Sequence, residues 1–206
     1  MPDSFLGSPR LNDLLGKMAV TFKGPVVRVK PLPGSQVLAT VQPRDDPKGE
    51  AIPAVVGAKV GAGKVVYLAA GLDAANYSSA YPYYRVALAD AVRWAAASPP
   101  PVEVAAPMCV HATTVRQTKD GERLVVHLFN DVNTTAGHGH PAEEVPLREE
   151  VLPVHDIAVT FRGYAIKRVR LEPQGLELKP EKGGDDLVAV TVPKLAVHAM
   201  VVAELA

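Results

Sequence analysis

The pattern of apolar positions changes at the run Ser98-Pro99-Pro100-Pro101. Before it, residues 82–97 place apolar side chains at helical spacing, with a proline in the first turn, where its missing N–H is not needed. After it, apolar and polar residues alternate in short runs that glycine, proline and aspartate interrupt, a pattern typical of β-strands. Successive prolines end a helix and begin a semi-rigid connector. The sequence therefore predicts two unlike domains, residues 1–98 and 99–206.

The first domain contains a predicted hairpin. Two β-rich runs, residues 52–60 and 64–69, flank Gly61-Ala62-Gly63, and glycine supplies the positive φ angles of a tight turn. Residues 65–70 are apolar on both faces, which is typical of a sheet interior with packing above and below. We expect the helix over residues 82–97 to pack on this sheet. A short helix over 10–18 and strands over 19–22, 26–30 and 36–41 complete the domain.

The second domain has the spacing of a β-sandwich. In the run 157–161, Ile157, Val159 and Phe161 face one way and polar or small residues the other, as in antiparallel sheets with one buried face. Residues 130–155 interrupt this rhythm, and a loop of that length is usually functional or mobile. The candidate strands cover residues 109–116, 124–129, 157–161, 169–171, 176–178, 187–192 and 197–205.

The composition narrows the function classes. Lys and Arg total 22 and Asp and Glu total 22, and this neutral balance argues against a nucleic-acid partner. No apolar run reaches the roughly 18 residues of a membrane span, so we expect no membrane partner. The single cysteine, Cys109, excludes an intramolecular disulfide. We expect a soluble, cytoplasmic chain.

Parts of both domains resemble a known family. The hairpin around Gly61-Ala62-Gly63-Lys64, followed by Gly71-Leu72-Asp73 and a helix ending in Val92-Arg93-Trp94-Ala95, is similar to the end of the class I glutamine amidotransferase-like trimerisation domain of β-galactosidases and related glycoside hydrolases. Residues 124–131 and 197–205 resemble strands of the β-sandwich that follows that domain. The resemblance implies an α+β protein: a partial flavodoxin-like α/β piece followed by an antiparallel β-sandwich domain.

The resemblance also implies a role without catalysis. The family's catalytic (β/α)₈ barrel, with its paired glutamates, is absent from this sequence, and so is most of the amidotransferase-like domain. The chain resembles the C-terminal end of a longer enzyme, with an accessory or assembly function. A sheet edge that the missing strands would cover favours self-association as a dimer or trimer.

The residues themselves offer no catalytic constellation. Cys109 lacks the flanking glycines of a nucleophile elbow. The pairs Glu143-Glu144 and Glu149-Glu150 lie in the long loop, where two carboxylates cannot hold the fixed separation that glycoside hydrolysis needs. We therefore assign no catalytic residue, no metal and no cofactor.

A tyrosine cluster is the first candidate contact site. Tyr77, Tyr81 and Tyr83 lie close together around the start of the predicted helix, and aromatic rings stack on sugars and are enriched at subunit contacts. In the alternative interpretation, Tyr84 is a core residue and the other tyrosines cap the entrance of the helix.

The long loop and its start are the second candidate. His127, His138 and His140 carry imidazoles, which suit zinc, but a zinc site needs three or four converging ligands. His127 lies between two apolar residues and is expected to be a hydrogen-bonded interior residue. Polar side chains at the loop's start are expected to fix it through hydrogen bonds to the backbone: Asn130, Asp131 and Asn133.

Two alternatives to the accessory role stay open: a carbohydrate-binding β-sandwich module, and a metal-dependent hydrolase that uses the histidine-rich loop.

Overall fold

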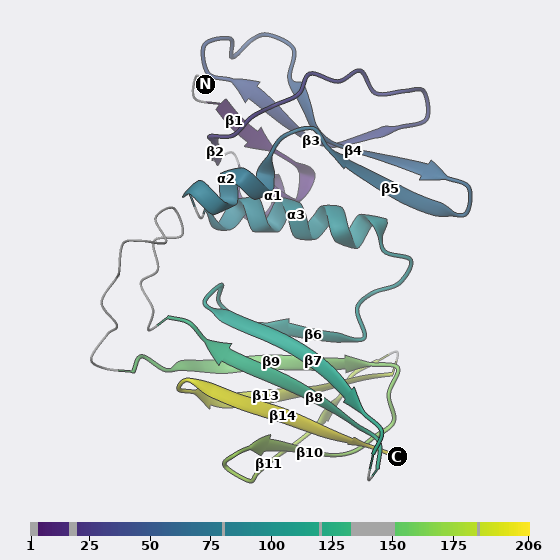
Figure 1. Cartoon of the computed structure of the whole chain (residues 1–206), viewed down its shortest axis with the longest axis vertical. Helices are drawn as coiled ribbons and strands as arrows, with labels where there is room; N and C mark the ends of the chain where they lie inside the picture. The colour runs from purple at the N-terminus through teal and green to yellow at the C-terminus, as the bar shows by residue number, and fades with distance from the viewer. Residues whose placement is uncertain (1–3, 17–19, 80, 120, 133–150, 185) are drawn as a thin grey trace. The chain divides into compact units, whose positions relative to one another are not determined.

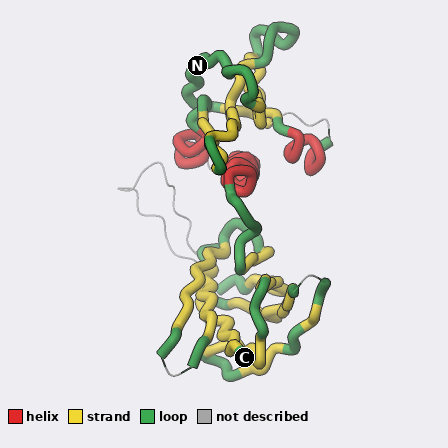
Figure 2. Tube along the Cα trace, turned by 90° about the vertical axis from the view of Figure 1, so that its right-hand side faces the viewer, coloured by secondary structure: helices red, strands yellow, loops and turns green. Residues whose placement is uncertain are grey.

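The structure, a computed structural model, describes residues 4–16, 20–79, 81–119, 121–132, 151–184 and 186–206. The chain forms two compact units: unit 1 extends to Pro99, and unit 2 begins at Pro100. Each unit buries a hydrophobic core of its own. Figure 2 shows helix only in unit 1 of the described chain, while strands occur in both units.

Unit 1 contains a five-stranded sheet in the order β2-β1-β3-β4-β5, and all its neighbouring strands are antiparallel. The described helices lie on one side of this sheet (Figure 1). Helix α3 packs against β4 and β5, and the two shorter helices pack against α3. The elements are β1 (Ser4–Gly7), α1 (Pro9–Leu15), β2 (Val20–Phe22), β3 (Gln36–Pro43), β4 (Ile52–Val60), β5 (Gly63–Leu68), α2 (Leu72–Ser79) and α3 (Pro82–Ala95).

The hairpin predicted around residue 61 is confirmed. Strand β4 pairs with β5 in continuous register, and Gly61 in the turn has a φ of 58°, which glycine adopts without strain. The long helix begins at the predicted Pro82 but ends at Ala95, because Ala96 has extended geometry. Gly57 allows the sheet to approach this helix closely, since a Cβ there would lie 2.7 Å from Cη2 of Trp94.

The structure does not show the flavodoxin-like arrangement expected of unit 1. A flavodoxin-like sheet consists of parallel strands, whereas the pairs here are antiparallel. The connections explain the difference. Parallel neighbours need crossovers of a dozen or more residues, but β4 and β5 are joined by a tight turn, and only residues 44–51 separate β3 from β4.

Tyr84 anchors α3 in the core of unit 1. Its side chain is 1% exposed, and its ring meets Phe22 edge-on at a centroid distance of 5.8 Å. The hydroxyl donates a hydrogen bond to the carbonyl of Thr21 at 2.7 Å. Burial raises the pKa of this hydroxyl above its ordinary value. The expectation that Tyr84 is a core residue is therefore confirmed, whereas Tyr81 makes no side-chain capping hydrogen bond at the start of the helix.

Unit 2 has a sandwich-like architecture of two antiparallel sheets. One has the strand order β11-β10-β14-β8-β7 and the other β12-β13-β9-β6. All seven strands expected from the alternating pattern are present, and the described residues add the short β6 and β12. The strands are β6 (Val102–Ala105), β7 (Val110–Gln117), β8 (Arg123–Asn130), β9 (Val154–Arg162), β10 (Ile166–Glu172), β11 (Leu176–Leu178), β12 (Glu181–Lys182), β13 (Leu187–Leu195) and β14 (His198–Leu205).

The core of unit 2 draws on both sheets. Ile157, Val159 and Phe161 of β9 are at most 1% exposed, which confirms the alternation expected there. They belong to one buried cluster with residues such as Val126 of β8 and Val201 of β14.

None of the helices in the described residues combines the length and apolar character that crossing a bilayer requires.

Candidate functional site

The candidate site is the outer face of the five-stranded sheet of unit 2. Alternate residues of β8 enter the core, so the residues between them point outward. The same alternation holds along β14. We define the outer face by Arg123, Val125, His127 and Phe129 of β8, by His198, Met200, Val202 and Glu204 of β14, and by their cross-strand neighbours on β7 and β10.

Rings gather at one end of the outer face. In register, Phe129 lies opposite His111 of β7 on one side and opposite His198 of β14 on the other. The rings of His111 and Phe129 lie 6.4 Å apart, and Phe129 remains 42% exposed. The His127 and His198 rings stack at 5.5 Å. The rings of His111, Phe129 and His198 lie in one row on three adjacent strands. They form a platform, here called the ring platform, on which a flat apolar surface can rest.

His127 lies beside this platform and is partly exposed, so it is not the interior residue expected from its apolar neighbours. In a strand, the residues before and after a position point to the opposite face, so apolar neighbours do not show that the position itself is buried. Its Nδ1 lies 3.3 Å from Nε2 of His198, which confirms that it is hydrogen-bonded.

A shallow hollow of about 530 Å³ extends along the outer face. Its floor is apolar and includes Val115 of β7, Val125 of β8 and Val202 of β14. Arg123, His127 and Met200 also line it. The hollow therefore combines an apolar floor with polar groups, as small-ligand sites do.

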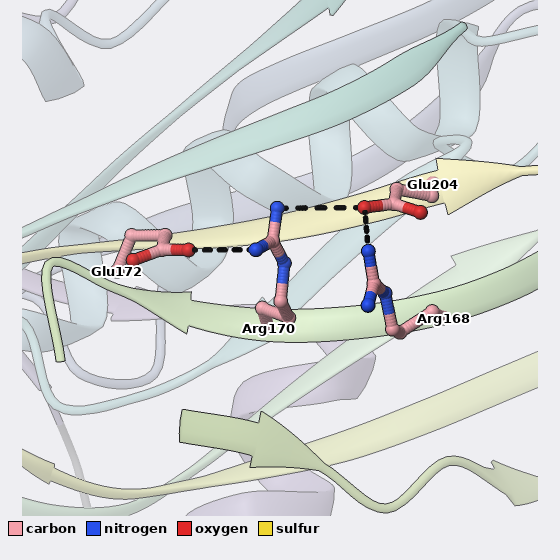
Figure 3. A network of polar contacts seen from close by, with 4 residues as sticks. All are labelled: Arg168, Arg170, Glu172 and Glu204. Atoms are coloured by element: carbon pink, nitrogen blue, oxygen red, sulfur yellow. Dashed lines mark hydrogen bonds and ion pairs between the residues drawn. The ribbon is translucent and has the colours of Figure 1, made fainter. Parts of the chain in front are cut away.

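An ion-pair network joins β10 to β14 on the outer face (Figure 3). Glu204 accepts a hydrogen bond from Arg168 at 2.7 Å and lies 3.4 Å from Arg170, which in turn lies 3.5 Å from Glu172. The hydrogen bond from Arg168 holds the pKa of the Glu204 carboxyl below its ordinary value. Such a network presents fixed donors and acceptors to a polar ligand.

Asn130 ends β8 and fixes the backbone around it. Its side chain is buried, and its Nδ2 donates to the carbonyls of Leu152 at 2.9 Å and Ala196 at 2.8 Å, with Leu195 at 3.3 Å. Its Oδ1 accepts from the N–H of Val132 at 3.0 Å, which confirms the expected hydrogen bond at the start of the long loop. The side-chain amide of Asn130 thus uses both its N–H groups and its oxygen in structural hydrogen bonds.

Asp131 lies at the end of the ring platform. One of its carboxylate oxygens is 3.4 Å from Nε2 of His111, and its backbone N–H donates to the carbonyl of Cys109 at 2.7 Å. Cys109 carries a free, partly buried thiol. Asn133, His138 and His140 lie outside the described residues. Within the described ranges, no three His, Cys, Asp or Glu side chains converge as metal ligands would.

The tyrosine cluster belongs to unit 1. The rings of Tyr81 and Tyr83 lie 6.2 Å apart, and Tyr81 lies 5.9 Å from the buried Tyr84. Tyr77 and Tyr81 are exposed, while Tyr83 packs partly against the core. Exposed tyrosines at this place are available for a contact with another molecule.

Several residues of the outer face were missing from the sequence-based candidates: His111, Phe129, His198 and the Arg168–Glu204 network. Period-two alternation within residues 197–205 already places His198 and Glu204 on one face. The partner of His198 is His127, which lies 71 residues earlier in the chain, and the partner of Glu204 is Arg168, which lies 36 residues earlier. Only the cross-strand register brings them together.

Comparisons with known proteins give a structural likeness. No protein-family model matches the sequence, and no curated protein does. The solved structure of α-L-fucosidase isoenzyme 2 from Paenibacillus thiaminolyticus matches over 100% of this chain, with a TM-score of 0.74 and 21% sequence identity.

This chain has the fold of part of that fucosidase. It spans 32% of the fucosidase's length, so the likeness concerns one portion of that enzyme. The match covers both units, and it does not single out the β-galactosidases that the sequence resembles.

Proposed function

We propose that this chain is a non-catalytic accessory region of a glycoside hydrolase, with a role in assembly and support. The observation that carries the proposal is the match of the whole chain to about a third of an α-L-fucosidase. A region that retains the fold of one portion of an enzyme is suited to support a catalytic part that lies elsewhere.

We further propose that the region corresponds to the end of an amidotransferase-like trimerisation domain and the sandwich that follows it in β-galactosidase-like enzymes. The order of elements supports this proposal: an antiparallel hairpin, β4 and β5, precedes the amphipathic α3, and a sandwich-like unit follows. The finer assignment rests on the sequence resemblance.

The electrostatics of the outer face favour a role without catalysis. A glycosidase needs one carboxyl with a raised pKa to act as general acid. The pKa of the Glu204 carboxyl is lowered instead, because the hydrogen bond from Arg168 stabilises its charged form. A carboxylate held in this way orients neighbouring groups and does not donate a proton near neutral pH.

Unit 1 offers a surface for assembly. Val37, Val56 and Tyr67 lie in one cross-strand row, on the side of the sheet opposite Gly57 and the helices. Val65 and Tyr67 are 51% and 52% exposed on β5, which within the described residues has only β4 as a sheet neighbour. An exposed apolar edge strand is a site for pairing between chains. We therefore propose that copies of this chain associate through β5 and this row.

Light scattering coupled to size exclusion tests the assembly role. We expect the purified chain to elute as a dimer or trimer of its 21.8-kDa protomer. The double variant Val65→Lys/Tyr67→Lys is expected to be monomeric, because two charges would have to be desolvated at the interface. The matched control is Leu32→Lys, at a position 76% exposed outside the strands, and it should retain the wild-type mass. A monomeric wild type, or a double variant that still associates, would contradict the assembly role.

A second candidate function, carbohydrate binding, is favoured by the ring platform. Aromatic rings stack on the C–H faces of sugars, and Phe129 is exposed between two histidines in neighbouring strands. The Arg168–Glu204–Arg170 network lies on the same face and can exchange hydrogen bonds with hydroxyls.

Calorimetric titration with galactosides, β-glucans and α-L-fucosides tests this second function. We expect Phe129→Ala to abolish binding of any glycan that the wild type binds. Leu176→Ala, at a similarly exposed position on β11, serves as the control and should bind normally. Flat titrations across the panel, or normal binding by Phe129→Ala, would exclude the ring platform as a sugar site.

A further inference from the structure

The paired histidines of the outer face have a second chemical property. His127 of β8 and His198 of β14 come from adjacent antiparallel strands, and both rings reach solvent in part. Their rings are nearly parallel, with an interplanar angle of 28°, and Nδ1 of His127 faces Nε2 of His198 across 3.3 Å. Two potential ligand nitrogens therefore lie side by side.

This separation is the one that a single metal ion requires. Imidazole nitrogens bind transition metals at about 2.0–2.1 Å, so two such nitrogens lie about 3.3 Å apart on a tetrahedral ion such as Cu⁺ and about 2.9 Å apart in neighbouring positions of the tetragonal geometry of Cu²⁺. The backbones that carry them are fixed, since β8 and β14 pair over seven consecutive positions, from Arg123–Glu204 to Phe129–His198. Both side chains reach solvent in part, so their rings can rotate to turn the two lone pairs toward a shared ion.

A third ligand is available next to the pair. Met200 lies directly opposite His127 in the register and two residues after His198 on the same strand, so its thioether shares the face of both rings. Thioethers are soft ligands that suit Cu⁺, and imidazole suits copper in both oxidation states. Among the divalent ions of the first transition row, Cu²⁺ binds such sites most tightly.

We propose that His127, His198 and Met200 form a copper-binding site on the outer face, with solvent in the remaining coordination positions. The site goes beyond the accessory role proposed above and needs no part of a catalytic centre. The proposed ligands do not include His138 or His140 of the histidine-rich loop.

Calorimetric titration of the full chain with Cu²⁺ tests the site. We expect one strongly bound ion per chain in the variant His138→Gln/His140→Gln, in which the loop histidines cannot contribute. In that background, His127→Gln and His198→Gln should each weaken binding by about tenfold or more, because each removes one coordinating nitrogen. His155→Gln is the matched control, because this exposed histidine lies on β9 of the other sheet, and it should leave the affinity unchanged.

Two further measurements test the identity of the ligands. The electron paramagnetic resonance spectrum of the Cu²⁺-loaded wild-type chain should show coupling to two imidazole nitrogens. Met200→Leu should weaken Cu⁺ binding more than Cu²⁺ binding, because the thioether prefers the softer ion. The site is overturned if copper binding disappears with the loop histidines, or if His127→Gln and His198→Gln bind as the control does. Equal Cu⁺ affinity in Met200→Leu would overturn the three-ligand arrangement.

Discussion

Replacing Asn130 with alanine removes the buried side chain that joins β8 to two other backbone segments. The amide donates two N–H groups, chiefly to the carbonyls of Leu152 and Ala196, and its oxygen accepts from the N–H of Val132. The substitution therefore deletes these three hydrogen bonds, together with the longer contact to the carbonyl of Leu195, at a position 2% exposed. A structural role predicts a large loss of stability, whereas a ligand-binding role predicts little.

The size of the loss follows from the contacts. Each intramolecular hydrogen bond contributes about 1 kcal/mol net, so Asn130→Ala should lower the free energy of unfolding by about 3 kcal/mol. With a denaturant slope of about 2 kcal/mol per molar urea, the midpoint should fall by about 1.5 M. Asn130→Asp retains the shape but directs a carboxylate at carbonyl oxygens, which raises its pKa in the folded state. Its stability should therefore be greatest below the unfolded pKa of about 4 and be lost as pH rises through the folded value.

Urea unfolding followed by far-ultraviolet circular dichroism measures these changes. The single tryptophan, Trp94, belongs to unit 1, so its fluorescence distinguishes a change in unit 1 from a change in unit 2. Asn12→Ala, at an exposed position of α1, is the control and should shift stability by less than about 0.5 kcal/mol. An Asn130→Ala protein as stable as this control, or an Asn130→Asp protein insensitive to pH, would refute the reasoning.

Three other substitutions test the packing and the electrostatics. Tyr84→Phe should lower the free energy of unfolding by about 1 kcal/mol at pH 7, because the Thr21 carbonyl loses its donor. Burial raises the pKa of Tyr84 in the folded state, so the wild type should lose this advantage as pH rises above about 10 through the folded value. A difference in urea midpoint that stays constant up to pH 11 would count against this reasoning. Gly57→Ala should destabilise unit 1 by about 1–3 kcal/mol and shift Trp94 emission, because the new methyl meets the indole at 2.7 Å; unchanged emission would contradict the close approach. The pKa of Glu204 is lowered from 4.5 in the folded state, so its contribution to stability is present above that pH and is lost as pH falls through the folded value. The urea midpoint of Glu204→Gln should therefore depend less steeply on pH in the acid range than that of the wild type. Identical profiles would argue against the pairing with Arg168.

Local periodicity was sufficient to predict elements whose pattern is strong. The stripe of α3 and its proline at the first turn marked that helix, and strict alternation at Ile157, Val159 and Phe161 marked β9 and its buried face. The helix α2 was missed because its eight residues include Asn76, Ser78 and Ser79, which are weak helix formers, and its apolar stripe is correspondingly short. Helix propensity is a weak signal in a segment this short.

Pairing between distant strands could not be predicted in the same way. Sequence pattern does not distinguish parallel from antiparallel neighbours in unit 1, because both arrangements bury the same residues of β4. The expectation that the run from residue 65 is packed on both faces is wrong for β5, where Val65, Tyr67 and Leu68 are exposed. Asn130 was expected to fix the adjacent loop, but its bonds to Leu195 and Ala196 depend on residues 65 and 66 positions away. His127 and His198 meet for the same reason, through the register of β8 and β14.

Turnover by the purified chain tests the accessory role most directly. The substrates are 4-nitrophenyl α-L-fucoside and 4-nitrophenyl β-D-galactoside, and release of nitrophenol is followed with the wild type and with Glu204→Gln. We predict that neither protein releases nitrophenol faster than buffer. Sustained release by the wild type that disappears on substitution of Glu204, or of any other single carboxylate, would contradict a non-catalytic role.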